Sequence, residues 1–203
     1  MPQSPPKDVI DHLVGIEPGS RLDTIRAARQ QARDNAQASY DALFSPDDES
    51  GMSLVERRAV AAFVAGLHRQ PEAAVVYYAD EFAASAPAGL AAAVAAEVAR
   101  GAAEGPTGRF PQAPLAGEST AAPSFAIAGE GRAALGERLA AALEHAHFLV
   151  FHPREAEPAR LQRLVAAGWS TPGIVTLSQL VSFLCFQLRV VVGLRALAAS
   201  PAS

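Results

Sequence analysis

The hydrophobic residues of this chain recur mainly at helical spacing. In one segment, hydrophobic residues recur every three or four positions, opposite a face rich in Arg and Gln: Leu22, Ile25, Ala28, Ala32, Ala36, Tyr40 and Leu43. This spacing predicts one amphipathic helix over 21–43. Comparable patterns predict further helices over 7–14, 53–68, 71–84, 87–101, 130–150, 158–167 and 170–199. Strand-like alternation never persists beyond a few residues, so we expect an all-α protein of about seven or eight helices.

Helix-start and helix-stop residues stand at the ends of these segments. Ser20 with Asp23, and Ser53 with Glu56, have the spacing of a capping box, in which the two side chains satisfy free backbone N–H groups. Gly168 follows the predicted helix over 158–167, at a position where a left-handed backbone favours glycine. These residues therefore locate the ends of the predicted helices more closely than the hydrophobic periodicity alone.

The C-terminal segment 170–199 is the most hydrophobic part of the chain. Ser170 is a suitable N-cap, Pro172 suits the first turn, and residues 180–194 are apolar on almost every side. A helix of this kind is expected to be buried, either inside a domain or between subunits. The run is shorter than the ~18 apolar residues of a membrane span, and Gln187 and Arg189 interrupt it. We therefore predict a buried central helix of a protein that does not cross a membrane.

The remaining chain divides into an N-terminal arm and a helical domain. Residues 1–19 are expected to form the arm with one short helix, and residues 20–203 the domain. Segment 105–129 carries four prolines and several glycines, and it is predicted to be irregular. An irregular segment of this length is either functional, for example ordered against a partner, or a simple connection, and the sequence leaves both open.

Composition excludes several classes of function. A net charge of −4 argues against sequence-independent nucleic-acid binding, which needs clustered Lys and Arg. The N-terminus lacks the apolar segment of a signal peptide, so a cytoplasmic location is the simplest expectation. The chain has one cysteine, and its histidines lack metal-ligand spacing, so we expect neither a disulfide within the chain nor a metal site. Glycine motifs for dinucleotides or phosphates are missing, and no cofactor is expected.

The candidate chemical residues lie on one stripe of the C-terminal helix. Ser178, Ser182, Cys185, Arg189 and Gly193 share a face at about 100° per residue. Arg189 is four residues after Cys185, so its guanidinium can lower the pKa of the thiol and activate it. The alternative is that Cys185 is a small buried apolar side chain. Ser182 and Arg189 are candidates for binding a substrate, although Arg189 equally suits a structural ion pair with a carboxylate.

Two segments together resemble a known family. The segment SLVERRAV, residues 53–60, is similar to the start of the signature helix of the alkylhydroperoxidase D and carboxymuconolactone decarboxylase family. The segment LQRLVAAGWSTPGIVTLSQLVSFLCFQLRVVVGL, residues 161–194, is similar to its C-terminal pattern of a short helix, a cap and a long apolar helix. The stretch over 8–27 and the loop over 105–118 look like features of an uncharacterised branch. The resemblance covers most of the chain and implies an all-helical, oligomeric fold.

The resemblance also implies a reaction, which this chain can carry out only in modified form. In the family, two thiols reduce a hydroperoxide while Glu and His relay protons. Counted from Glu56, the two thiol positions fall near Gln70 and Ala73, and the His position near Tyr77. The two-cysteine mechanism is therefore not possible here. Glu56, His68 and Cys185 remain as candidate catalytic residues, with Glu56 also the expected partner of Arg189.

Two functions follow as hypotheses. One is a peroxidase-related oxidoreductase that acts in a pocket near Glu56, His68, Cys185 and Arg189. The other is a non-catalytic relative that binds a small molecule or a partner subunit, either a copy of itself or a paralogue. Both hypotheses include a homo-oligomer, because the apolar C-terminal helix offers more surface than one subunit is expected to cover.

Overall fold

The computed structural model describes residues 6–121 and 123–200. Across these residues the regular secondary structure is helical, apart from one isolated antiparallel bridge between Gly108 and Thr120. The helices are α1 (Val9–Val14), α2 (Arg21–Ala27), α3 (Gln30–Phe44), α4 (Leu54–His68), α5 (Glu72–Ala83), α6 (Leu90–Gly101), α7 (Gly129–Phe151), α8 (Pro158–Ala166) and α9 (Thr171–Ala199). Two short 3-10 helices, η1 (Leu115–Glu118) and η2 (Pro153–Glu155), complete them. The all-α fold with a long C-terminal helix is confirmed.

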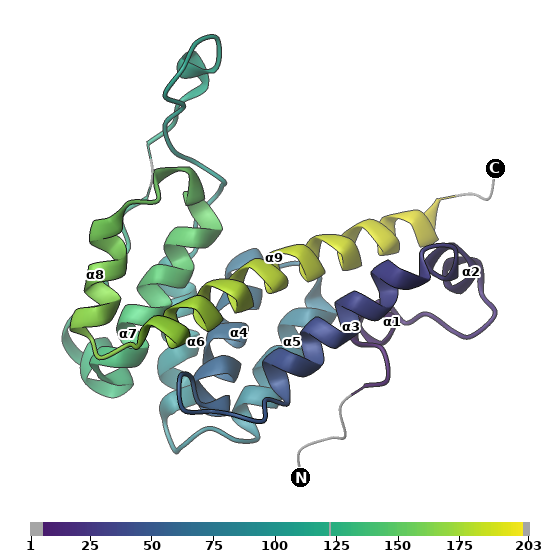
Figure 1. Ribbon diagram of the computed structural model, residues 1–203, viewed down its shortest axis with the longest axis horizontal. Helices are drawn as coiled ribbons and strands as arrows, with labels where there is room; N and C mark the ends of the chain where they lie inside the picture. Colours follow the sequence, from purple (N-terminus) through teal and green to yellow (C-terminus); the bar gives the residue numbers. More distant parts are fainter. Residues whose placement is uncertain (1–5, 122, 201–203) are drawn as a thin grey trace.

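The helix buried on every side is α4, rather than α9 as predicted. It packs against α5, α6, α7 and α9, and its side chains from Ala59 to Ala61 and from Phe63 to Ala65 are fully buried. Figure 1 shows α9 lying across the outside of this group, with α7 and α8 near its N-terminal half and α1 and α2 near its C-terminal end. The core therefore forms around α4, which has small side chains that let its neighbours approach closely.

One face of helix α9 is buried and the opposite face is exposed, although hydrophobic residues lie on almost every side of the helix. Its inner face, which includes Leu177, Leu180, Leu184, Leu188 and Val191, is at most 1% exposed. Its outer face leaves Val175 51%, Phe186 49% and Val192 41% exposed. In the single chain, the prediction that α9 is buried is therefore right for its inner face and wrong for its outer face. By length and composition, α9 is also the one helix of the described residues that is apolar enough to cross a membrane.

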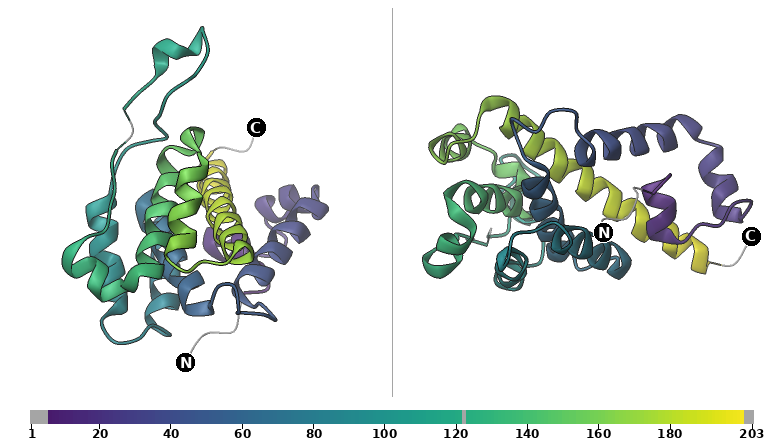
Figure 2. Two further views of the ribbon diagram at one scale, coloured as in Figure 1. Left: turned by 60° about the vertical axis from the view of Figure 1, so that its left-hand side comes forward. Right: turned by 90° about the horizontal axis from the view of Figure 1, so that it is seen from below.

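The predicted helix over 21–43 is two helices, because the backbone breaks at Ala28 and Arg29. Arg29 has φ −127° and ψ 54°, outside the helical region. The break turns α2 across the end of α3, as the right-hand view of Figure 2 shows. This turn lets Arg26 of α2 and Arg33 of α3 reach the same two carboxylates of α1, Asp8 and Asp11. No Gly or Pro marks the break, so periodicity could not locate it.

The predicted cap signals are confirmed. The Ser53 and Glu56 side chains form the reciprocal capping box at the start of α4, and Ser170 accepts a hydrogen bond from the Gly173 N–H at the start of α9. A second departure from the predicted helices lies inside α7, where Gly136 has φ 75° and interrupts the helical backbone. Glycine reaches this left-handed region without the strain that a side chain would add.

Residues 106–121 leave the helical body as an extended arm, with η1 at its tip (Figures 1 and 2). They form most of the described part of the segment over 105–129 that was predicted to be irregular. Near the end of that segment the chain lies against the body again, where Phe125 stacks on His147 and Ile127 is 1% exposed. The arm is fixed at its base, where the Thr107 N–H donates to the carbonyl of Phe151 and the Arg109 N–H donates to Glu155 at 3.1 Å. Residues 111–121 of the tip are exposed.

Candidate functional site

The structure brings His68, Cys185 and Arg189 together between α4 and α9. His68 is the last residue of α4, and its Nε2 atom lies 3.4 Å from the Cys185 Sγ atom. Arg189, one helical turn after Cys185, donates from Nη1 to the Cys185 carbonyl at 2.8 Å. The sequence predicted the proximity of Arg189 to Cys185 from their spacing. His68 joins them because α4 ends beside the middle of α9.

The electrostatics of this group keep both the thiol and the imidazole neutral near pH 7. Burial raises the pKa of the Cys185 thiol, and the neighbouring Arg189 only partly opposes that rise. Burial, assisted by the charge of Arg189, lowers the pKa of His68 to about 4. The prediction that Arg189 activates the thiol is thus wrong in its net result. A buried thiol without net stabilisation of its anion is a weak nucleophile.

Glu56 lies at the opposite end of α4 from His68. The two residues are 12 positions apart, which is about 18 Å along the helix. Glu56 accepts hydrogen bonds from the Ser53 N–H and hydroxyl, and its Oε1 atom lies 2.6 Å from Arg138 Nε. The expected ion pair between Glu56 and Arg189 is therefore wrong. Arg189 is exposed rather than buried, so it needs no internal carboxylate. Glu56 caps a helix and anchors α7 to it, away from the thiol.

Ser182 lines a groove whose lining does not include His68, Cys185 or Arg189. Its hydroxyl donates to the Ser178 carbonyl at 2.8 Å, as serine does on an exposed helix face. The groove has a volume of about 1090 Å³ and runs between the end of α3, the following loop and the first half of α9. Its apolar lining includes Leu161, Val175 and Phe186, each more than 40% exposed, and its rim carries Asp47 and Asp48.

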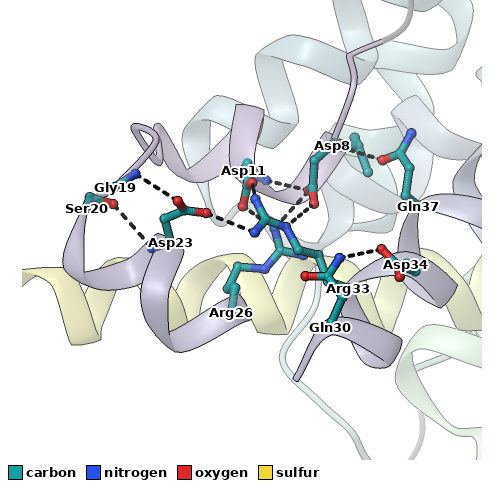
Figure 3. Close-up of polar contacts among 11 residues, drawn as sticks. Asp8, Asp11, Gly19, Ser20, Asp23, Arg26, Gln30, Arg33, Asp34 and Gln37 are labelled. Carbon is teal, nitrogen blue, oxygen red and sulfur yellow. Dashed lines mark hydrogen bonds and ion pairs between the residues drawn. The ribbon is translucent and has the colours of Figure 1, made fainter. Parts of the chain in front are cut away.

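A second polar group joins α1, α2 and α3. Figure 3 shows Asp8, Asp11 and Asp23 facing Arg26 and Arg33. Arg26 and Arg33 each pair with both Asp8 and Asp11, and Arg33 also reaches Asp23 at 2.9 Å. Partial burial by itself raises the pKa of Asp8, but hydrogen bonds from Arg26, from the Asp11 N–H and from Arg33 outweigh it and hold that pKa below its ordinary value.

Each of the three carboxylates in this group pairs with at least one guanidinium, which is the arrangement of a structural cluster. A cavity of about 850 Å³ lies beside it. Of the carboxylates that line this cavity, Asp8, Asp11 and Asp23 bind guanidinium groups, and Asp34 and Asp41 accept hydrogen bonds from glutamine amides. Sequence reasoning missed the cluster. The available signal was the spacing of the charges. Asp8 and Asp11 are three residues apart, and Arg26 and Arg33 are seven apart, which would place the two arginines on one face of the helix predicted over 21–43.

A third polar group lies inside the bundle. The Tyr78 hydroxyl donates to the side-chain carbonyl of Gln187 at 2.5 Å, and both residues are at most 2% exposed. The Tyr40 and Tyr77 hydroxyls lie 2.5 Å apart. Burial is the main cause that raises the pKa of each of these three tyrosines, so they remain protonated near neutral pH. The described residues contain no group of three or more His, Cys, Asp or Glu side chains arranged to hold a metal ion.

No protein-family model matches this chain, and no curated protein does. The chemical possibilities must therefore be judged from the residues themselves. A neutral thiol beside a neutral imidazole can transfer its proton to that imidazole only when a substrate arrives. The open groove, in contrast, offers apolar surface in the resting protein. The geometry favours binding over nucleophilic chemistry.

Proposed function

We propose that this chain is an alkylhydroperoxidase-D-like helical protein without thiol peroxidase activity, which acts as a binding subunit in an assembly of its own copies. The observation that carries this proposal is the outer face of α9. Val175 and Phe186 lie half exposed along a groove that also contains Leu161. Large apolar side chains that are grouped on an exposed surface commonly mark a contact with another molecule.

The state of the thiol argues for a binding role. Burial raises the pKa of Cys185, and His68, with its pKa of about 4, stays uncharged near neutral pH. The pair therefore lacks the thiolate and imidazolium form that makes a cysteine reactive at rest. With one cysteine in the chain, a disulfide cannot form within it after attack on a peroxide.

A single-cysteine peroxidase is the second candidate, and the 3.4 Å contact between His68 Nε2 and Cys185 Sγ favours it. In that reaction the thiol sulfur attacks the outer oxygen of a hydroperoxide and the O–O bond breaks. The products are a sulfenic acid and an alcohol, and His68 carries the thiol proton to the departing oxygen. A thiol of another molecule would have to reduce the sulfenic acid, because this chain offers no second cysteine.

Two measurements separate these candidates. The first follows hydroperoxide loss with the intact protein and its Cys185→Ser variant, with a small thiol as reductant. The binding proposal expects equal, background rates, whereas a rate that depends on Cys185 would overturn it in favour of the peroxidase. The second determines the molecular mass in solution over a range of concentrations. An assembly is expected, and a monomer at every concentration would contradict the proposal.

A further inference from the structure

The outer face of α9 is a continuous seam with the spacing that packed helices use. Its members are Val175, Gln179, Ser182, Phe186, Arg189, Gly193 and Ala196, and all of them are exposed. They alternate steps of four and three residues, the pattern by which two helices pack side by side at a small crossing angle. Ser182, Gly193 and Ala196 are small, which lets a second helix approach closely.

Charge is distributed unequally along this seam. Asp47 and Asp48 are exposed and line the groove, as do Val175 and Thr176 of α9. The loop that carries them lies against the first turn of α9, where a Cβ added at Gly173 would be 2.3 Å from the Gly51 carbonyl oxygen. The buried Arg57, which also lines the groove, already donates to the Leu43 and Met52 carbonyls. The free charge at this end is therefore acidic.

The opposite end of the seam carries a positive charge. Arg189 is exposed, and within the described residues it forms no ion pair; its hydrogen bond there goes to the carbonyl of Cys185 in its own helix. Sixteen residues separate it from Gly173, which is about 24 Å along an α-helix. Arg189 therefore cannot reach Asp47 or Asp48 of its own chain.

We infer that two copies of this chain associate through this seam, with their α9 helices antiparallel and Ser182 at the two-fold axis. This inference rests on the proposed self-association and names its surface. Arg189 follows Ser182 by seven residues and Val175 precedes it by seven, so a two-fold axis at Ser182 places Arg189 of each copy beside the acidic rim of the other. A two-fold interface requires such self-complementarity, in which each contact occurs twice.

The antiparallel arrangement with the two-fold axis at Ser182 also gives Phe186 an apolar site. Phe186 lies four residues after Ser182, so in the dimer it faces the level of Ser178 and Gln179 of the second copy. There the groove is lined by Ala42 and Leu43 on its other side. A large aromatic side chain that enters a hollow of small residues is the usual centre of a stable interface. The opposite charges at the two ends then fix the antiparallel direction.

A charge swap tests the contact between copies. Arg189→Glu, and separately the double variant Asp47→Arg with Asp48→Arg, should each raise the dimer dissociation constant at least about tenfold, since every change acts twice. The combined triple variant should restore association. Arg195→Glu is the matched control, because it reverses an equally exposed charge on α9 outside the seam. Circular dichroism and thermal unfolding of each variant establish that it is folded.

Cross-linking tests the position of the axis. In a Cys185→Ser background, Ser182→Cys should form a disulfide-linked dimer under mild oxidation, because the two copies of this residue meet. Ala196→Cys is exposed on the same seam but lies 14 residues from the axis, so its two copies are about 42 Å apart and should not cross-link.

The outcomes distinguish this interface from self-association in general. If the protein is a dimer, but Arg189→Glu leaves its dissociation constant unchanged and Ser182→Cys does not cross-link, the seam is not the interface and the proposed assembly uses another surface. If the protein is a monomer at all concentrations, both the interface and the proposed assembly are wrong. Restoration by the charge swap together with the Ser182 cross-link is the expected result.

Discussion

Arg138 of α7 and Glu56 of α4 form an ion pair, with 2.6 Å between Nε and Oε1. The same guanidinium donates to the Gly51 and Gly168 carbonyls and lies 4.0 Å from the centre of the Trp169 ring. One side chain thus connects α7, the start of α4 and the loop that leads into α9. The acidic residue that the family resemblance made a proton relay is instead part of a structural junction.

Replacement of Arg138 by Leu should lower the free energy of unfolding by about 2–3 kcal/mol, because Glu56 and two carbonyls lose a charged donor. Glu56→Gln should cost less, about 1 kcal/mol, since glutamine can still close the capping box with Ser53. Arg163→Leu, a change at an exposed position on α8, serves as the control. Urea unfolding measures all three. Equal stability of the Arg138 and Arg163 variants would contradict the junction.

Arg189 is expected to contribute, after burial, to the low pKa of His68. Its charge adds to burial in lowering the pKa of His68 to about 4. In Arg189→Gln this pKa should rise towards 6.5, while the pKa of Cys185 should rise further because the guanidinium no longer favours the thiolate. NMR titration of the His68 ring protons measures the first effect. An unchanged His68 pKa would mean that Arg189 points away from the imidazole in solution.

Stability should fall as pH decreases from about 6.5 towards 4. Burial lowers the pKa values of His145 and His147 to about 4, so the unfolded chain binds protons in this range that the folded chain does not. Each fully buried histidine can contribute about 3 kcal/mol to this loss. Below pH 4, protonation of carboxylates such as Asp8, whose pKa is lowered in the folded chain, should remove further stability.

Replacement of His147 by Gln tests the histidine contribution. His147 is 2% exposed and its Nε2 atom lies 2.9 Å from the Gly101 carbonyl, a contact that a glutamine amide can replace. The variant should lose less stability than the unsubstituted protein between pH 6.5 and 4. His12→Gln, at an exposed position on α1, is the control for the substitution itself. Parallel profiles for all three proteins would show that His147 does not titrate as a buried group.

The cluster of α1, α2 and α3 should behave as a coupled unit. Arg26 is 9% exposed and pairs with both Asp8 and Asp11, so Arg26→Met leaves two partly buried carboxylates with one guanidinium. We expect a loss of about 2–4 kcal/mol. Arg33→Met alone should also be costly, and the double variant should cost less than the sum of the two. Additive losses in this double-mutant cycle would contradict a shared network.

Local sequence signals located most helices correctly because caps and prolines act within one turn. Ser53, Glu56 and Ser170 needed no tertiary information to be recognised. The break at Arg29 depends instead on Asp8 and Asp11, about 20 residues away in the chain, and no spacing rule contains that contact. The exposure of Phe186 was also beyond the sequence, since a helix that is apolar on all sides gives no sign of which face its own chain covers.

For the candidate site, spacing within one helix was informative and pairing between helices was not. Cys185 and Arg189 are neighbours because they are one turn apart, as predicted. Glu56 and Arg189 stand on different helices, and only the packing of α4 against α9 decides which end of α4 meets Arg189. That end carries His68. The net pKa of Cys185 depended on burial, which periodicity cannot measure in an apolar helix.

Helix α9 is one uninterrupted rod that contacts α7 and α8 as well as α1 and α3. Insertion or deletion of a single residue near Cys185 would turn everything beyond it by about 100° and shift it by about 1.5 Å. Leu188 and Val191 would then leave the interior, and Arg189 would leave the seam. The number of residues in α9 thus fixes which side chains face inward at its two ends. The helix should therefore tolerate substitutions far better than insertions or deletions.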